Sequence, residues 1–282
     1  MRIVLAENHY GKARVRLVKV TRSAGRHELS ELTVHVALEG DFGAAHIAGD
    51  NSKILPTDTM KNTVYVLAKQ CRTDPIENFG SLVAQYFLKN NPQVSGAQID
   101  LIEHLWDRIP VDGQPHPWAF TSRGLEKRVA RVMGTRDRTD IESGIEDLVV
   151  LKTTESAFAG YIHDAYTTLP EANDRILATV IKVNWSYTDT SGVDFNALCN
   201  GVRQLLLTRF AGHKSQSVQH TLYTMGEAVL ARYDVVAAMH LTLPNRHCLL
   251  VDLSRFGLPN PNEIFQPVDE PHGLMEATVK RG

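Results

Sequence analysis

The strongest constraint on the fold is an order of apolar patterns that occurs twice along the 282-residue chain. In each half, strand-like segments come before and after two stretches of helical periodicity, which gives the order strand, strand, helix, helix, strand, strand. Strands are predicted at about 2–21, 31–38, 94–108, 116–122, 125–136, 148–154, 176–187, 235–243 and 247–253. Helices are predicted at about 57–70, 74–87, 194–210 and 217–233.

This repeated order predicts an α+β protein of two similar domains, at residues 1–138 and 139–282. The boundary is placed in the polar, charged stretch 136–142, where a change of domain disturbs the fewest contacts. In each domain a four-stranded sheet would bury one face under its two helices. The other face still carries apolar residues and the sheet edges need cover, so we expect an oligomer.

Local signals refine the ends of these elements. Thr57 or Asp58 is a suitable N-cap for the first helix, and Asp74-Pro75 places a cap and a proline at the start of the second. Asp194 is expected to begin the third helix. The segment 9–12 is interpreted as a hairpin turn and the segment 243–247 as a connection between two strands.

Composition and charge exclude several classes of protein. Thirty basic and 32 acidic residues give a formal charge of −2, so no overall field favours nucleic acid or an anionic membrane. Three widely spaced cysteines argue for a reducing compartment and against a disulfide framework. Charge interrupts the N-terminal apolar residues too early for a secretory signal, and the last residues, 279–282, are not a peroxisomal signal. We therefore expect a cytoplasmic protein.

The sequence also lacks the usual motifs that hold cofactors and activate nucleophiles. None of its 19 glycines forms a Gly-x-Gly dinucleotide motif, and the chain has no P-loop and no Gly-x-Ser-x-Gly elbow. Neither Cys-x-x-Cys nor His-Glu-x-x-His occurs, and the 12 histidines are scattered. Any chemistry is therefore expected to come from the substrate and from ordinary side chains, with no metal and no organic cofactor.

Several polar segments are unusual for plain loops, and their order along the chain resembles the urate oxidase (uricase) family, in particular its bacterial members. The segments are Tyr10-Gly11-Lys12, Thr57 to Tyr65, Leu151 to Thr154, Phe158 to Tyr161, Tyr166 to Leu169, Asp174 to Leu177, Ser217 to Gln219, Leu243 to His247 and Asn260 to Phe265. One such segment alone is a weak signal, whereas this series covers nearly the whole chain. The resemblance implies two tandem tunnelling-fold (T-fold) domains, with antiparallel sheets that assemble into a β-barrel tunnel.

The resemblance also implies a reaction and a catalytic triad. Uricases oxidise urate with dioxygen and water to 5-hydroxyisourate and hydrogen peroxide without a cofactor, because the electron-rich purine anion can itself give electrons to oxygen. Lys12, Thr57 and His247 match the family's proton relay. A threonine hydroxyl can accept a proton on one side and donate one on the other, and a histidine can orient and tune the lysine.

The remaining matched residues would hold the purine. Arg175 and Gln219 would grip its edges, Phe158 would stack on its face, and Asn245 would hold dioxygen or water above its plane. The main-chain amides of Asp58 and Val218, together with Leu169, complete the predicted substrate contacts. In the family the site is shared between subunits of a homotetramer, so the resemblance implies the same here. Arg246 and Cys248 depart from the family's common pattern.

Plainer interpretations exist for each residue. Thr57 alone is usually a helix cap, Lys12 a solvated turn lysine, Arg175 the partner of Asp174 in a surface ion pair, and Phe158 a core residue. Two other functions also remain open. A pterin-converting enzyme of the same fold would anchor its heterocycle with a glutamate and often use zinc, and an inactive purine-binding oligomer would bind urate without chemistry.

Overall fold

The computed structural model describes residues 3–282, so the first residue of the predicted arm 2–21 lies outside the described part. Internal contacts divide the chain into two compact units that meet between Gly144 and Ile145. The strand β5 (Thr139–Lys152) runs through this division, and the predicted boundary at 138 falls just before that strand. Each unit is described separately below.

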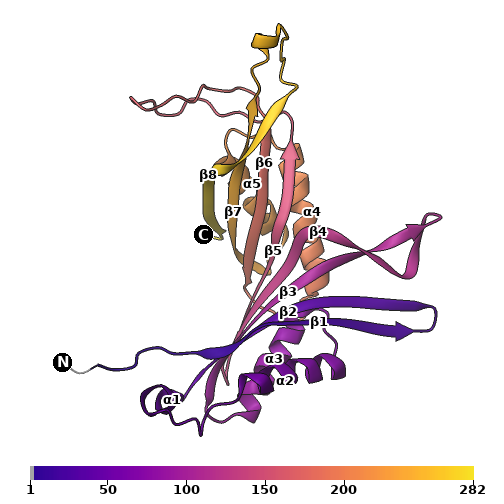
Figure 1. Cartoon of the computed structure of the whole chain (residues 1–282), viewed down its shortest axis with the longest axis vertical. Helices are drawn as coiled ribbons and strands as arrows, with labels where there is room; N and C mark the ends of the chain where they lie inside the picture. The colour runs from indigo at the N-terminus through magenta and orange to yellow at the C-terminus, as the bar shows by residue number, and fades with distance from the viewer. Residues whose placement is uncertain (1–2) are drawn as a thin grey trace. The chain divides into compact units, whose positions relative to one another are not determined.

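The first unit is an antiparallel sheet with the strand order β1-β2-β3-β4. The strands are β1 (Tyr10–Ser23), β2 (Arg26–Gly40), β3 (Val94–Val111) and β4 (Gln114–Gly134). The helices are α1 (Gly43–Ala48), α2 (Thr57–Gln70) and α3 (Ile76–Asn90). Helix α2 packs on β1, and α3 packs on β3 and β4, while the far ends of both hairpins extend past the helices (Figure 1).

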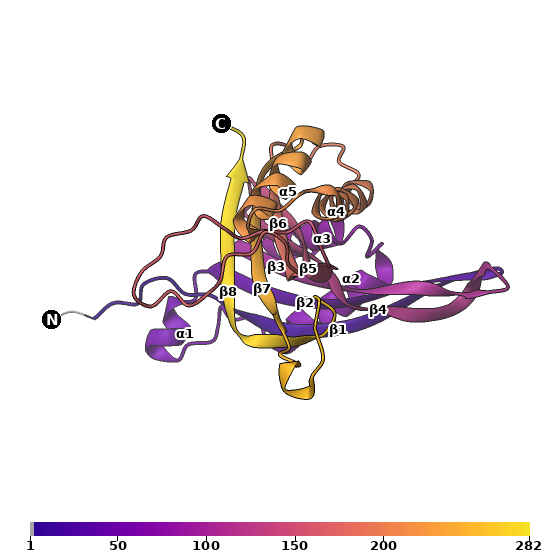
Figure 2. The same cartoon turned by 90° about the horizontal axis from the view of Figure 1, so that it is seen from above.

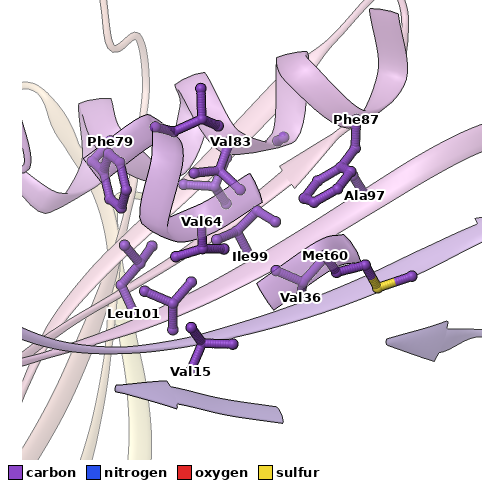
Figure 3. Close-up of a cluster of buried hydrophobic side chains, with 14 of the residues drawn as sticks. Val15, Val36, Met60, Val64, Phe79, Val83, Phe87, Ala97, Ile99 and Leu101 are labelled. Atoms are coloured by element: carbon purple, nitrogen blue, oxygen red, sulfur yellow. The ribbon is translucent and has the colours of Figure 1, made fainter. Parts of the chain in front are cut away.

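The core of this unit follows from the helical periodicity of α3 and the alternation of buried residues in β2. Helix α3 buries Phe79, Val83 and Phe87, which are four residues apart and therefore share one face (Figure 3). Strand β2 buries Val36 and Leu38 on the face that the helices cover. Complete burial of a large apolar side chain stabilises a fold by roughly 1.5–3 kcal/mol, so this cluster accounts for the pairing of helices with sheet.

The second unit has its own apolar core. Its strand order is β5-β6-β7-β8, with β6 at Leu177–Tyr187, β7 at Val236–Leu250 and β8 at Phe265–Lys280. The helices α4 (Phe195–Gly212) and α5 (Val218–Arg232) pack against each other on one side of these strands (Figure 2). Trp185 is only 1% exposed within this core, and its indole N–H donates to the Tyr187 hydroxyl at 3.0 Å.

Three expectations about strands are wrong. The segment 9–12 is not a turn, because Lys12 lies inside β1 and the hairpin turns between Ser23 and Arg26. The two strands predicted at 116–122 and 125–136 are one strand, β4. The segment 243–247 lies inside β7, where Pro244 pairs with Leu274 of β8 and the register with β8 shifts between Asn245 and His247.

Strand β8 was not predicted at all. Its sequence contains Pro267, Glu270 and Pro271, and most of its side chains are exposed, so it has no clear alternation of apolar residues. Prolines are tolerated at the outer edge of a sheet, where the missing N–H group has no partner to bond. The strand still contributes Met275 and Val279 to the second core.

The helices differ in whether a side chain caps their first turn. Asp194 caps α4 as predicted, because its side chain accepts hydrogen bonds from the amides of Asn196 and Ala197. In contrast, neither Thr57 nor Asp74 is a cap. Pro56 and Pro75 take the cap positions of α2 and α3, and Thr57 is the first residue of its helix.

The predicted α+β class is confirmed by the two mixed units. No helix within residues 3–282 is both long enough and apolar enough to span a membrane.

Candidate active site

The backbone around Lys12 is built to hold this side chain in one direction. An added Cβ on the preceding Gly11 would stand 1.7 Å from the carbonyl oxygen of Val36, so only glycine fits there. Directly after Lys12 the pairing with β2 shifts by a β-bulge, in which Arg14 adopts a left-handed φ of 58°. Bulges commonly redirect side chains next to functional sites.

Thr57 and Asp58 lie at the start of α2. Thr57 is half-buried and is the first residue of the helix, so its hydroxyl does not occupy the N-cap position. The Asp58 carboxylate accepts hydrogen bonds from Lys61 and Asn62. The hydrogen bond from Lys61 is the main cause of the lowered pKa of Asp58, and the positive charge of Lys12 lowers that pKa further. The first unit therefore brings Lys12 close to the start of α2.

Phe158 and Arg175 lie together in the second unit. The Cζ atom of Arg175 stands 5.1 Å from the centre of the Phe158 ring. Burial lowers the pKa of Arg175, and its Nε atom is buried without a hydrogen-bond partner among the described residues. Asp174 instead accepts a 2.6 Å hydrogen bond from Thr154, so the plain interpretation of an Asp174–Arg175 ion pair does not apply.

The start of α5 adjoins the segment that carries Phe158. Ser156 pairs with Ser215, and the amide of Ala157 donates to the Ser215 carbonyl at 2.8 Å. Ser217 caps the helix by accepting from the amide of His220. This leaves the amides of Val218 and Gln219, at the first turn, free of helical partners, as at every helix start. Val218 is buried and Gln219 is exposed.

Asn245 has strand partners on both sides of β7, and His247 has a partner on β8. Asn245 is buried and pairs with Thr179 of β6 and Gly273 of β8. His247 is half-buried and pairs with Val268 across the bulge.

The two residues that depart from the family pattern adjoin His247 on β7. Arg246 donates a 2.6 Å hydrogen bond to Asp269, and Cys248 is a free thiol. Neither replaces a predicted site residue.

Among the predicted substrate contacts, Leu169 does not join Phe158 and Arg175 through its side chain. The Leu169 side chain is exposed, while its carbonyl accepts a hydrogen bond from Tyr161. The Tyr161 ring stacks on Phe158 with ring centres 4.7 Å apart. Tyr161 supports the aromatic platform and was missed as a candidate, although its position three residues after Phe158 is visible in the sequence.

Within residues 3–282 no three His, Cys, Asp or Glu side chains converge in a way that could hold a metal ion.

Comparison with known proteins places these features in one family. The uricase family model matches residues 8–133 and 141–276. A uricase from Arthrobacter globiformis is 44% identical over 99% of this chain and 91% of the relative, and one from Dictyostelium discoideum is 38% identical over 98% and 97%. The crystal structure of the Arthrobacter globiformis uricase aligns with a TM-score of 0.95 over 100% of this chain and 96% of that one.

These matches cover both units, and they confirm the predicted tandem tunnelling fold. The chain belongs to the uricase family.

Proposed function

We propose that this chain is a urate oxidase, which converts urate, dioxygen and water into 5-hydroxyisourate and hydrogen peroxide without a cofactor. Two electrons and two protons pass from urate to dioxygen to form the peroxide, and the water supplies the hydroxyl group added to the purine. The observation that carries this proposal is the Arg175 guanidinium over the Phe158 ring, with a buried and unpaired Nε. A planar anion is the ligand that satisfies both groups.

Each of the site residues in the second unit suits a different part of urate. The fork of Arg175 can bond two acceptors on one edge of the purine, and the amide of Gln219 offers both a donor and an acceptor to another edge. The free amides at the start of α5 favour negative charge near Val218. Phe158, backed by Tyr161, offers an aromatic face for the ring plane. We assign binding and orientation to these residues.

The proton steps are assigned to Lys12, Thr57 and His247. The Thr57 hydroxyl does not serve as the cap of α2, and Lys12 lies near the start of the same helix. A proton taken from urate would pass to the Thr57 oxygen as the Thr57 proton passes to Lys12, while His247 orients the lysine. Asn245, buried on β7, is proposed to hold dioxygen or the attacking water above the purine.

We further propose that the site is completed in a homotetramer. Lys12, Thr57 and Asp58 belong to the first unit, and the other residues assigned to the site belong to the second. One subunit would supply the first set and its neighbour the second, as the family resemblance implies. Exposed apolar side chains on edge strands, such as Val18 on β1 and Leu274 on β8, suit an association of this kind.

The test is an aerobic assay of the purified protein with urate. We expect loss of the purine's ultraviolet absorbance, with one dioxygen consumed and one peroxide released per urate. The same preparation is analysed for zinc and assayed with a reduced pterin. Urate binding without peroxide would favour an inactive purine-binding protein, and stoichiometric zinc with pterin turnover would favour the other enzyme class.

A further inference from the structure

We propose that Tyr10 is a positioning residue that sets the placement of Lys12 relative to Thr57. This inference rests on the proposed urate oxidation and on the relay assigned to those two residues. It adds to that relay a group that does not touch the substrate.

Tyr10 joins the two segments that carry the relay. Its hydroxyl donates to the Leu55 carbonyl at 3.1 Å and accepts from the Leu55 amide at 2.8 Å. Tyr10 is two residues before Lys12, and Leu55 is two residues before Thr57. One phenol group thus connects points 45 residues apart in sequence, each at the same short distance from a relay residue.

The phenol ring is itself fixed. The Phe42 ring meets it edge-on with ring centres 4.7 Å apart and an interplanar angle of 89°, and Phe42 is fully buried. Burial raises the pKa of Tyr10 more than the hydrogen bond with Leu55 lowers it, so the hydroxyl keeps its proton and can donate. On the other side, an added Cβ on Gly11 would stand 1.7 Å from the Val36 carbonyl oxygen, so the strand packs closely against β2 between Tyr10 and Lys12.

The position of the segment before Thr57 depends on contacts like the one between Tyr10 and Leu55. Residues 49–56 form neither helix nor strand. The other contacts of this segment include the Asp50 amide bond to the Ala44 carbonyl, an ion pair from Lys53 to Asp41, a hydrogen bond from Gln93 to the Lys53 carbonyl, and apolar contacts of Ile54 and Leu55. The Tyr10 clamp is the hydrogen bond that joins this segment to the strand that carries Lys12.

Proton transfer is sensitive to this kind of placement. Donor and acceptor must approach to about 2.6–3.2 Å, and a misplacement of ~1 Å can cost on the order of a hundredfold in rate. Purine binding is assigned mainly to residues of the second unit, where Tyr10 makes no contribution. Loss of the clamp is therefore expected to lower kcat and to leave KM nearly unchanged.

The experiment compares Tyr10→Phe with the matched control Tyr65→Phe. The Tyr65 hydroxyl also joins α2 to β1, by donating to the Arg16 carbonyl at 3.3 Å, but it lies two turns along the helix from Thr57. We expect Tyr10→Phe to lose about tenfold or more in kcat, with KM within about twofold of the parent. The acidic limb of its pH–kcat profile should shift, because the relay is altered. Tyr65→Phe should keep both the parental kcat and the profile.

A double-mutant cycle with Thr57→Ala separates positioning from general stability. If Tyr10 acts through the relay, Tyr10→Phe should cost little further kcat once Thr57 is removed, since residues that act as a unit are not additive. The same fold-loss in both backgrounds, equal losses in the two Tyr→Phe variants, or a loss confined to KM would each overturn the positioning role. A parent protein that consumes no oxygen with urate overturns the proposed function, whereas an active parent with an unimpaired Tyr10→Phe variant overturns only this inference.

Discussion

Pro56, and not Thr57, precedes α2 at the cap position, so the Thr57 hydroxyl is not the capping group of this helix. A capping hydroxyl would be committed to an amide of the first helical turn. At the first helical position the side chain is instead free to face a ligand, while its backbone is held by the helix. The residue thus combines a fixed backbone with a polar group that does not cap the helix.

Replacement of Thr57 by alanine should therefore affect turnover far more than binding. We expect kcat to fall by roughly a hundredfold or more, because proton transfer by a positioned group contributes on the order of 10²–10⁴. Urate affinity, measured by anaerobic titration, should change much less. Thr63→Ala on the same helix, which loses only a hydrogen bond to the Thr59 carbonyl, is the control. Parental turnover in Thr57→Ala would contradict the relay.

Replacement of Arg175 should have the opposite signature. Arg175→Ala removes the guanidinium that stands over Phe158, so we expect KM to rise by at least tenfold, equivalent to about 1.4 kcal/mol or more. Arg175→Lys should not restore affinity, because an ammonium lacks the planar fork. Arg232→Ala, which removes a similar contact with the Tyr233 ring, is the matched control. A near-normal KM in Arg175→Ala would exclude the assigned grip.

The sequence motifs led to Lys12, Thr57 and Arg175, because each is a polar residue in a recognisable segment. They did not lead to Tyr10 or Tyr161, whose roles depend on contacts across space. Tyr10 lies beside Lys12 in the same motif, yet its partner is a backbone group at Leu55 that no side-chain pattern marks. Residues that support a site through main-chain contacts leave little trace in a single sequence.

At the scale of elements, the four long helices differ in how their first turns are satisfied. Asp194 and Ser217 cap α4 and α5 with their side chains, while α2 and α3 follow prolines without a side-chain cap. The second unit's helices therefore depend on single polar side chains in a way that the first unit's do not.

The cap of α4 gives a direct stability test. Asp194→Ala should lower the free energy of unfolding by about 1 kcal/mol, because two amides lose their acceptor. Asp194→Asn should be nearly neutral, since an asparagine oxygen accepts equally well. Chemical denaturation of both variants measures the difference. Equal losses in the alanine and asparagine variants would show that charge, and not capping, is what matters.

The strands show where periodicity is informative and where it is not. Strands β2 and β6 are buried on the helix-covered face and were visible from their apolar residues. Strand β8 is an exposed edge strand with two prolines, so its position depends on pairing with β7 and not on its own pattern. The same pairing keeps Pro244 and Asn245 within a strand, although their sequence is typical of a turn.

At the scale of the whole molecule, each unit has a separate apolar core, and the first also buries a charged cluster. The Glu77 carboxylate is fully buried, accepting from Arg128 and from Ser143, each at 2.6 Å. Arg128 also lies 3.8 Å from Glu103. The cluster ties the start of α3 to the sheet, and it makes the stability of the first unit sensitive to pH.

Glu103 makes a contribution to that response whose direction follows from its burial. Burial raises its pKa, with Arg128 opposing the rise and Asp74 and Glu77 adding to it, while Arg123 opposes it slightly. A carboxyl whose folded-state pKa is raised stabilises the fold most below its unfolded value of about 4.3, and this contribution is lost as the pH rises through the folded-state pKa. Glu103→Gln should therefore have a higher melting temperature than the parent at pH 8.

That advantage should shrink towards pH 4, where the parental carboxyl is also neutral. The exposed Glu263→Gln variant is the control and should follow the parent at both pH values. A Glu103→Gln variant that is less stable than the parent at pH 8 would show that the bond to Arg128 outweighs the cost of burying the charge.

The positions of the three tryptophans provide a natural optical label for the two units. Trp185 is enclosed in the second core, while Trp106 and Trp118 lie partly exposed on the β3–β4 hairpin of the first unit. An indole in an apolar, water-free surrounding emits at shorter wavelength than one in contact with water. The blue edge of the protein's fluorescence therefore reports on the second core, and the red edge on the β3–β4 hairpin, so that loss of structure in either unit is visible without an added dye.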